Sequence, residues 1–198
     1  MADKVAAGRP QEQELTVPDV EAWRAWLAAN VDDEVGVWLT LAKKGTTSPT
    51  SLTYAQALQE ALCQGWIDGQ TKSVDERVYR QRFTRRRARS LWSKRNVGYV
   101  AELTAAGRMQ PNGLAEVERA KADGRWDAAY AGPATIEVPP ELTAALDAEP
   151  AARAAFDGLS GQNRYAVLFR VTTAAKPETR ARRIETLVAM LARGETPH

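Results

Sequence analysis

The sequence predicts an α+β fold, in which a small antiparallel or mixed sheet with packed helices is followed by an all-helical C-terminal domain. Two strand-like segments separated by a short polar turn lie within 66–84. Helical and strand-like patterns alternate before them, and only helical patterns remain beyond residue 140. With 44% hydrophobic and 26% charged residues, the 198-residue chain has the composition of a globular protein with a substantial core.

The chain divides into four parts by composition. Residues 1–13 are polar and predict a mobile tail, and residues 14–130 carry the mixed helix and strand patterns of an α+β domain. The glycine and proline clusters within 131–140 predict a linker, because these residues interrupt helices and strands. Residues 141–198 then form the helical C-terminal domain.

The first elements are a helix and a strand. Apolar residues recur at helical spacing after Asp19, which predicts a short helix that ends near Asn30. Residues 35–42 form a mostly apolar run, typical of a strand that is covered on both faces. Lys43 follows this run directly, so we expect its side chain at the end of a strand.

The clearest helix begins after Thr53. Thr53 and Gln56 have the spacing of a capping box, in which each side chain binds the backbone N–H of the other residue. The helix is predicted to stop at Gly65, because glycine readily takes the left-handed conformation that follows a last helical turn.

The next segments predict an antiparallel hairpin, with strands at 66–72 and 77–84. Side chains alternate between the two faces of a strand, so Phe83 lies on one face of the second strand and Arg80 and Arg82 on the other. On the first strand, Trp66 and Asp68 share a face. We expect that face to be the polar one, with Asp68 opposite Arg80 or Arg82.

The remaining elements are all predicted to be helical. Ser93 and Asn112 are candidate caps of two helices that end near Gly107 and Gly124. Beyond the linker, apolar spacing predicts four further helices, at 141–148, 150–157, 161–174 and 177–193.

A strongly basic run extends from Arg77 to Arg95. It contains nine arginine or lysine residues and no acidic residue, while the whole chain carries a formal charge of only +2. A cluster of charges of one sign attracts anions, so this run favours an anion site. The alternative is that its arginines are simply solvated on a strand and the loop that follows.

Several kinds of chemistry are excluded by composition. Cys63 is the only cysteine and His198 the only histidine. These counts exclude an intramolecular disulfide, a zinc site built from cysteine and histidine, and Ser–His–Asp or Cys–His catalysis. We therefore expect no metal and no cofactor, and we interpret Cys63 as a core residue rather than a nucleophile.

The sequence also bears on location. It has no apolar run long enough to span a membrane, and its N-terminus lacks the apolar centre of a signal peptide. We therefore expect a cytoplasmic protein with no membrane span.

Four segments resemble the YdeI/OmpD-associated family of bacterial proteins, also labelled bacteriocin-protection proteins. They are ALCQGWIDGQ, QRFTRRRARSLWSKRN, AAGRMQPNGLAEVERAKADGRWDAAY and AAKPETRARRIETLVAMLARG, and the resemblance extends from about Leu15 onward. It implies an α+β front, a helical tail and a role in protection against antimicrobial compounds, without an established reaction. The sequence departs from the family at Gly69, where serine is usual, and at Arg85, where proline is usual.

We expect one ligand-binding cleft where the hairpin, the turn after it and the end of the preceding strand converge. Asp68 is the candidate catalytic residue. The alternatives are that it orients a ligand or that it pairs with the arginines and holds them in place, and such structural ion pairs are more common than catalytic carboxylates. The candidate ligand-binding residues are charged, polar or aromatic: Lys43, Trp66, Asp68, Arg80, Arg82, Ser90, Trp92, Ser93, Lys94 and Asn96.

Three functions remain open. The first is a small-molecule-binding protein that sequesters an anionic or aromatic ligand, such as an antimicrobial compound. The second is a cofactor-free enzyme that uses Asp68 with arginine and lysine as electrostatic stabilisers. The third is a nucleic-acid-binding protein, which the low total charge and the lack of a known nucleic-acid motif disfavour. The sequence does not define the oligomeric state.

Overall fold

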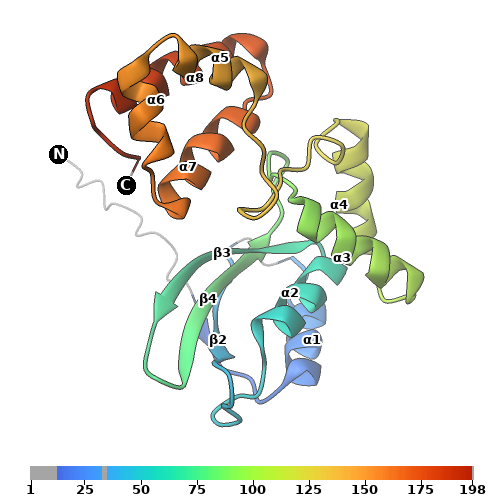
Figure 1. Ribbon diagram of the computed structural model, residues 1–198. Helices are drawn as coiled ribbons and strands as arrows, with labels where there is room; N and C mark the ends of the chain where they lie inside the picture. The colour runs from blue at the N-terminus through green and yellow to red at the C-terminus, as the bar shows by residue number, and fades with distance from the viewer. Residues whose placement is uncertain (1–12, 33–34, 198) are drawn as a thin grey trace, which may run out of the picture. The chain divides into compact units, whose positions relative to one another are not determined.

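The computed structural model describes residues 13–32 and 35–197, which form two compact units (Figure 1). The described part of the first unit comprises 13–32, 35–90 and 98–126, and the second comprises 91–97 and 127–197. The predicted tail at 1–13 lies outside the described residues except for Gln13, which belongs to a strand.

The first unit is built on a four-stranded mixed sheet, which confirms the α+β fold class. Its strands have the order β1-β2-β4-β3, with β1 parallel to β2 and the other neighbours antiparallel. The sequence did not predict β1, because three residues are too few to show a periodic pattern. The strands are β1 (Gln13–Leu15), β2 (Val37–Ala42), β3 (Trp66–Ser73) and β4 (Val78–Arg85).

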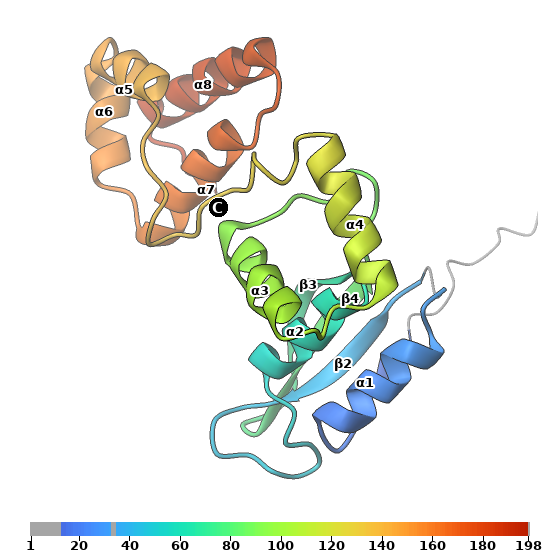
Figure 2. The ribbon, with the colours of Figure 1, turned by 90° about the vertical axis from the view of Figure 1, so that its right-hand side faces the viewer.

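Two helices, α1 (Val20–Ala29) and α2 (Tyr54–Cys63), cover one face of this sheet (Figures 1 and 2). The ring of Trp23 lies 5.5 Å from that of Phe83 on β4, and its Nε1 donates to the carbonyl of Ala57. This contact joins both helices to the sheet. The buried core between them contains Trp23, Leu27, Val37, Leu39, Leu41, Ala57, Leu58, Ala61, Leu62, Trp66 and Phe83.

The predicted boundaries of α2 are confirmed. Thr53 and Gln56 form the capping box, and Gly65 has a φ of 77°, in the left-handed region that favours glycine.

α4 (Pro111–Ala122) packs closely against the end of α2. A Cβ on Gly113 would lie 2.2 Å from the carbonyl oxygen of Cys63, so only glycine allows the two backbones to approach this far. The prediction that Asn112 caps α4 is wrong. The helix instead begins with Pro111 after Gln110, because proline is well suited to a first turn.

A bulge interrupts the pairing of β3 with β4 between Asp68 and Thr71. The buried side chain of Gln81 fills this irregularity, since its Nε2 donates to the carbonyls of Gly69 and Gln70 and its Oε1 accepts from the hydroxyl of Thr71. A Cβ at Gly69 would meet its nearest neighbour at 3.7 Å, which is ordinary contact. The departure from serine at this position is therefore not imposed by space.

The second unit is a bundle of four helices, as the spacing of apolar residues predicted. α3 (Lys94–Ala105) starts in the segment of this unit at 91–97 and continues into the first unit. The bundle itself consists of α5 (Pro140–Asp147), α6 (Pro150–Asp157), α7 (Gly161–Thr172) and α8 (Pro177–Ala192). Its core contains Leu142, Leu146, Phe156, Val167, Leu168, Val171, Ile184, Leu187 and Leu191. In the described ranges, the protein has no helix with the length and hydropathy needed to cross a membrane.

Candidate functional site

The register of the hairpin places Asp68 and the arginines Arg80 and Arg82 on opposite faces of the sheet, although we expected them to face one another. Asp68 pairs with Phe83, and paired residues of an antiparallel sheet project from the same face. Asp68 therefore lies on the face covered by α1 and α2, whereas Arg80 and Arg82 lie on the opposite face. The expectation that Asp68 faces these arginines is wrong, because alternation within one strand does not fix its register against the next.

Trp66 and Asp68 both have partners on this helix-covered face. The Trp66 side chain is fully buried, and its ring lies 5.7 Å from that of Trp26 in an edge-on arrangement. The carboxylate of Asp68 accepts a hydrogen bond of 2.8 Å from the hydroxyl of Tyr54 on α2. Trp66 is thus a core residue rather than a stacking surface, and Asp68 joins β3 to α2.

The arginines on the opposite face each contact a neighbouring segment of the first unit. Arg80 forms an ion pair of 2.6 Å with Glu14 on β1, and Arg82 donates to the carbonyl of Val35. Trp38 lies on this same face with the ammonium of Lys72 3.8 Å from its ring centroid. These contacts order the arginines along the sheet.

Lys43 and Ser90 stabilise turns. Lys43 Nζ donates to the carbonyl of Asp75, which holds the β3–β4 turn. Ser90 accepts from the backbone N–H of Arg87 through its hydroxyl and from Arg125 through its carbonyl.

The other predicted site residues belong to the second unit, whereas the hairpin belongs to the first. Trp92 and Asn96 are buried, and Lys94 is exposed. Ser93 accepts from the backbone N–H of Asn96, which is the capping contact that its position at the start of α3 predicted. Ser93, Lys94 and Asn96 thus lie at the start of α3, and Trp92 precedes it.

A pocket of about 380 Å³ lies in the first unit where the chain leaves β4. Three consecutive residues after the strand, Arg85, Arg86 and Arg87, line one part of it, and Glu116 and Arg119 on α4 line the rest. We call these five residues the arginine pocket. The backbone N–H of Arg86 donates to the carbonyl of Gly65, which holds this segment beside the end of α2, where α4 also packs.

The arginine pocket is strongly positive. Of the described residues that line it, four are arginines and one, Glu116, is acidic, and Arg119 pairs with Glu116 through Nη1 and Oε1 at 2.8 Å. Arg86 is only 5% exposed, while Arg85 keeps a loose ion pair of 3.6 Å with the exposed Asp32. Glu116 is 8% exposed, and within the described ranges no donor reaches its Oε2. A ligand in this pocket would meet several cationic donors and one buried acceptor.

A second polar cluster lies in the first unit around Glu60, which is 3% exposed. Arg24 binds its carboxylate with two hydrogen bonds of 2.8 and 2.9 Å, and Arg108 binds it with a third. Burial acts to raise the pKa of Glu60, but its hydrogen bonds and charge attraction to the two arginines outweigh burial, so its pKa lies below the usual value. Sequence reasoning missed this residue. The sequence feature that could have identified Glu60 is an acidic side chain in the apolar stripe of α2, three positions after Ala57.

Cys63 borders the same cluster, and a cavity of about 530 Å³ is lined by it together with Glu60, Arg24 and Arg108. Burial, aided by the negative charge of Glu60, raises the pKa of the Cys63 thiol to about 11. The thiol is therefore protonated at neutral pH, which argues against a nucleophilic role.

Cys63 is expected to resist alkylation in the native protein. With a pKa near 11, only roughly 0.1% of the thiol is ionised at pH 8, and the thiolate is the reactive form. Iodoacetamide labelling followed by mass spectrometry should therefore be at least about a hundredfold slower in buffer than in denaturant. Labelling at similar rates in the two conditions would contradict a buried, protonated thiol.

Two family models match the chain, and they cover different parts of it. Residues 15–116 match a domain family described as a domain of unknown function (DUF8412), and this match covers more than half of the chain. The chain therefore belongs to that family. Residues 135–194 match the bacteriocin-protection, YdeI or OmpD-associated family. The resemblance to that family is confirmed for the C-terminal part, but the expectation that it extends back to Leu15 is not.

No curated protein and no solved structure matches the chain.

Proposed function

We propose that the protein binds a small anionic ligand in the arginine pocket and acts as a sequestering, resistance-type protein. The observation that carries the proposal is the presence of four arginines around one pocket of about 380 Å³. Holding like charges together costs repulsion, and an anion relieves that cost. The description of the family that matches the C-terminal part, bacteriocin protection, supports the resistance role.

The side chains support a particular ligand chemistry. Guanidinium groups bind phosphate and carboxylate groups through paired, charge-assisted hydrogen bonds. The buried Oε2 of Glu116 can accept a hydrogen bond from a hydroxyl or amine of the same ligand. The pocket volume is near the lower end of the range for small-molecule sites. We therefore propose a small phosphate or carboxylate compound that also carries a hydrogen-bond donor.

Binding is expected to depend on the arginines that line the pocket. Arg87→Ala and Arg119→Ala should each weaken a bound phosphate or carboxylate compound at least about tenfold, because a hydrogen bond to a charged group contributes about 1.5–3 kcal/mol. The compounds would first be found by thermal-shift screening of phosphate esters, small carboxylates and antimicrobial compounds, and affinities would be measured by calorimetry.

Arg89→Ala is the matched control. Arg89 is exposed and belongs to the same basic run, but it does not line the pocket, so its loss removes the same charge without removing a contact. If Arg89→Ala weakens binding as much as Arg87→Ala does, the effect is general charge attraction and the proposal fails. Binding of single-stranded nucleic acid that persists at 150–200 mM salt, without binding of small anions, would also overturn it.

Recovery of the ligand distinguishes sequestration from catalysis. A compound released unchanged by denaturation, as shown by mass spectrometry, agrees with sequestration, whereas a chemically altered compound would indicate an enzyme instead.

Glu116→Gln should weaken ligands that carry a donor group and leave inorganic phosphate unaffected or more tightly bound, because the substitution removes a negative charge from the pocket.

A further inference from the structure

A second pocket lies entirely in the second unit, between α7 and α8. Its volume is about 580 Å³. Its apolar wall is formed by Phe169 on α7, Leu187 on α8 and Leu91, which precedes α3. Leu91 is 46% exposed, so a large apolar side chain remains accessible beside this pocket.

Three arginines, Arg170, Arg182 and Arg183, lie beside this apolar wall, and none of the described residues that line the pocket is acidic. Arg183 Nη1 donates to the carbonyl of Arg170 at 2.6 Å. This hydrogen bond ties α8 to the end of α7 and holds one guanidinium group in a fixed position. The rim of the pocket is therefore cationic and partly ordered before any ligand arrives.

The remaining polar groups of the wall are already used within their own helices. The hydroxyl of Thr173 donates to the carbonyl of Phe169, and that of Thr186 donates to the carbonyl of Arg182. The Phe169 ring is held by Tyr130, with ring centroids 4.9 Å apart in an edge-on arrangement. The wall thus offers an apolar surface, and the arginines are the groups that can make polar contacts with a ligand.

We propose that this pocket binds a small amphipathic anion, with an apolar body against Phe169 and Leu187 and a carboxylate or similar head on the arginines. The positive charge of the arginines favours a negatively charged head, and the apolar wall favours an apolar body. The volume suits a ligand of drug-like size rather than a polymer. The site shares no residue with the arginine pocket, so it does not depend on the function proposed above.

Octanoate is the probe, since it has one carboxylate and a flexible apolar chain. Ligand-observed NMR and calorimetry should show binding of octanoate but not of acetate, which lacks the body, or of octanol and octylamine, which lack the negative head. Arg182→Ala and Leu91→Ser should each weaken octanoate at least about fivefold. Both side chains are exposed, so neither substitution is expected to unfold the bundle.

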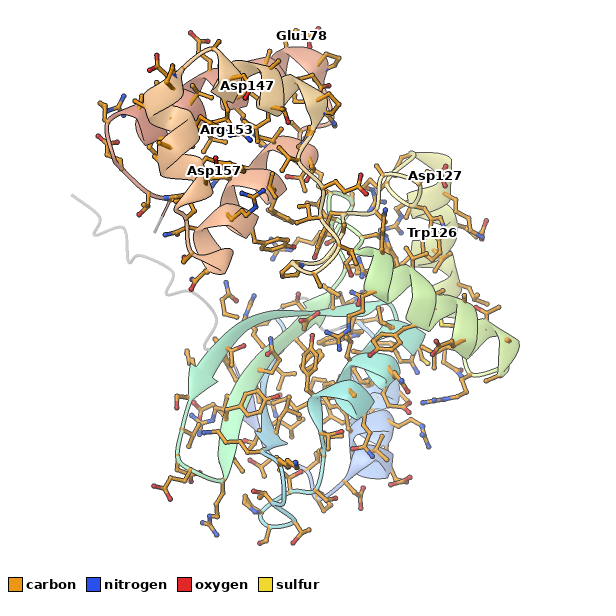
Figure 3. All side chains as sticks on the ribbon, in the orientation of Figure 1. Trp126, Asp127, Asp147, Arg153, Asp157 and Glu178 are labelled. Atoms are coloured by element: carbon orange, nitrogen blue, oxygen red, sulfur yellow. The ribbon has the colours of Figure 1, made fainter. Side chains whose placement is uncertain are left out.

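Arg153→Ala is the matched control in the same unit. Arg153 lies on α6 and pairs with Asp147 and Asp157 (Figure 3). It does not line the pocket. Its loss should leave octanoate affinity within about twofold. Octanoate affinity that is unchanged in Arg182→Ala and Leu91→Ser would overturn the proposal. Equal weakening by Arg153→Ala, or equal binding of octanol, would overturn it as well.

Discussion

Gly113→Ala is expected to lower the free energy of unfolding by about 2–3 kcal/mol, which corresponds to a fall of roughly 5–10 °C in Tm for a chain of this size. The added Cβ would lie 2.2 Å from the carbonyl oxygen of Cys63 and 2.8 Å from that of Leu62. Both are backbone atoms of α2 and cannot rotate away as a side chain could. α4 would have to move, and the hydrogen bond from the N–H of Gln110 to the carbonyl of Cys63 would be strained with it.

Gly98→Ala provides the control. Gly98 lies inside α3, is exposed, and has no atom within 4 Å of its ideal Cβ position. Alanine should therefore stabilise the protein there by about 0.5–1 kcal/mol, because glycine loses more backbone entropy on folding. Chemical denaturation of both variants measures the difference. If Gly113→Ala is as stable as the parent protein, α4 does not approach α2 as closely as described.

Glu60→Gln is expected to destabilise the protein by about 2 kcal/mol at neutral pH. Breaking a fully buried ion pair costs about 3–5 kcal/mol. The partners here reduce that value, because the side chains of Arg24 and Arg108 are 52% and 38% exposed and water partly screens them. The loss remains large because one carboxylate joins α1, α2 and the segment that precedes α4.

The effect of Glu60 should depend on pH in a defined direction. The pKa of Glu60 is lowered by folding, so its stabilising contribution is fully present above its unfolded value of about 4.5 and is lost as the pH falls through the folded value. The Tm difference between the parent protein and Glu60→Gln should be constant from pH 6 to 8 and should shrink below about pH 4.5. A difference that grows in acid would contradict the charged pairing.

Glu118→Gln is a suitable comparison. Glu118 pairs with Lys121 on the exposed side of α4, with 69% of its side chain exposed. Surface pairs of this kind contribute about 0.2–1 kcal/mol. Chemical denaturation should therefore show a much smaller loss for Glu118→Gln than for Glu60→Gln.

Helices were predictable because their determinants are local. The capping box at Thr53, the stop at Gly65 and the apolar spacing of the last helices all lie within a few residues of the structure that they specify. The basic run was also visible as a local concentration of charge, and three of its arginines line the arginine pocket. Arg85, which departs from the proline that the family resemblance implies, is one of them.

The candidate site was not predictable to the same extent, because it depends on contacts between distant segments. Nothing near Asp68 in the sequence specifies its pairing with Phe83, and that pairing decides which face it occupies. Glu116 and Arg119 join the arginines only because Gly113 lets α4 approach α2, some fifty residues away in the chain. Trp66 and Trp92 were proposed as ligand-binding surfaces, but burial in a core uses aromatic residues just as well.

The bulge in β3 also affects how the protein meets other copies of itself. β3 is at the edge of the sheet, and five of its eight residues are exposed. An exposed edge can serve as a template on which another chain adds a strand, which is a first step toward aggregation. The bulge breaks the regular row of backbone groups, and Gln81 engages the carbonyls of Gly69 and Gln70. We therefore expect intermolecular strand addition to be less favourable at this edge than along a regular strand.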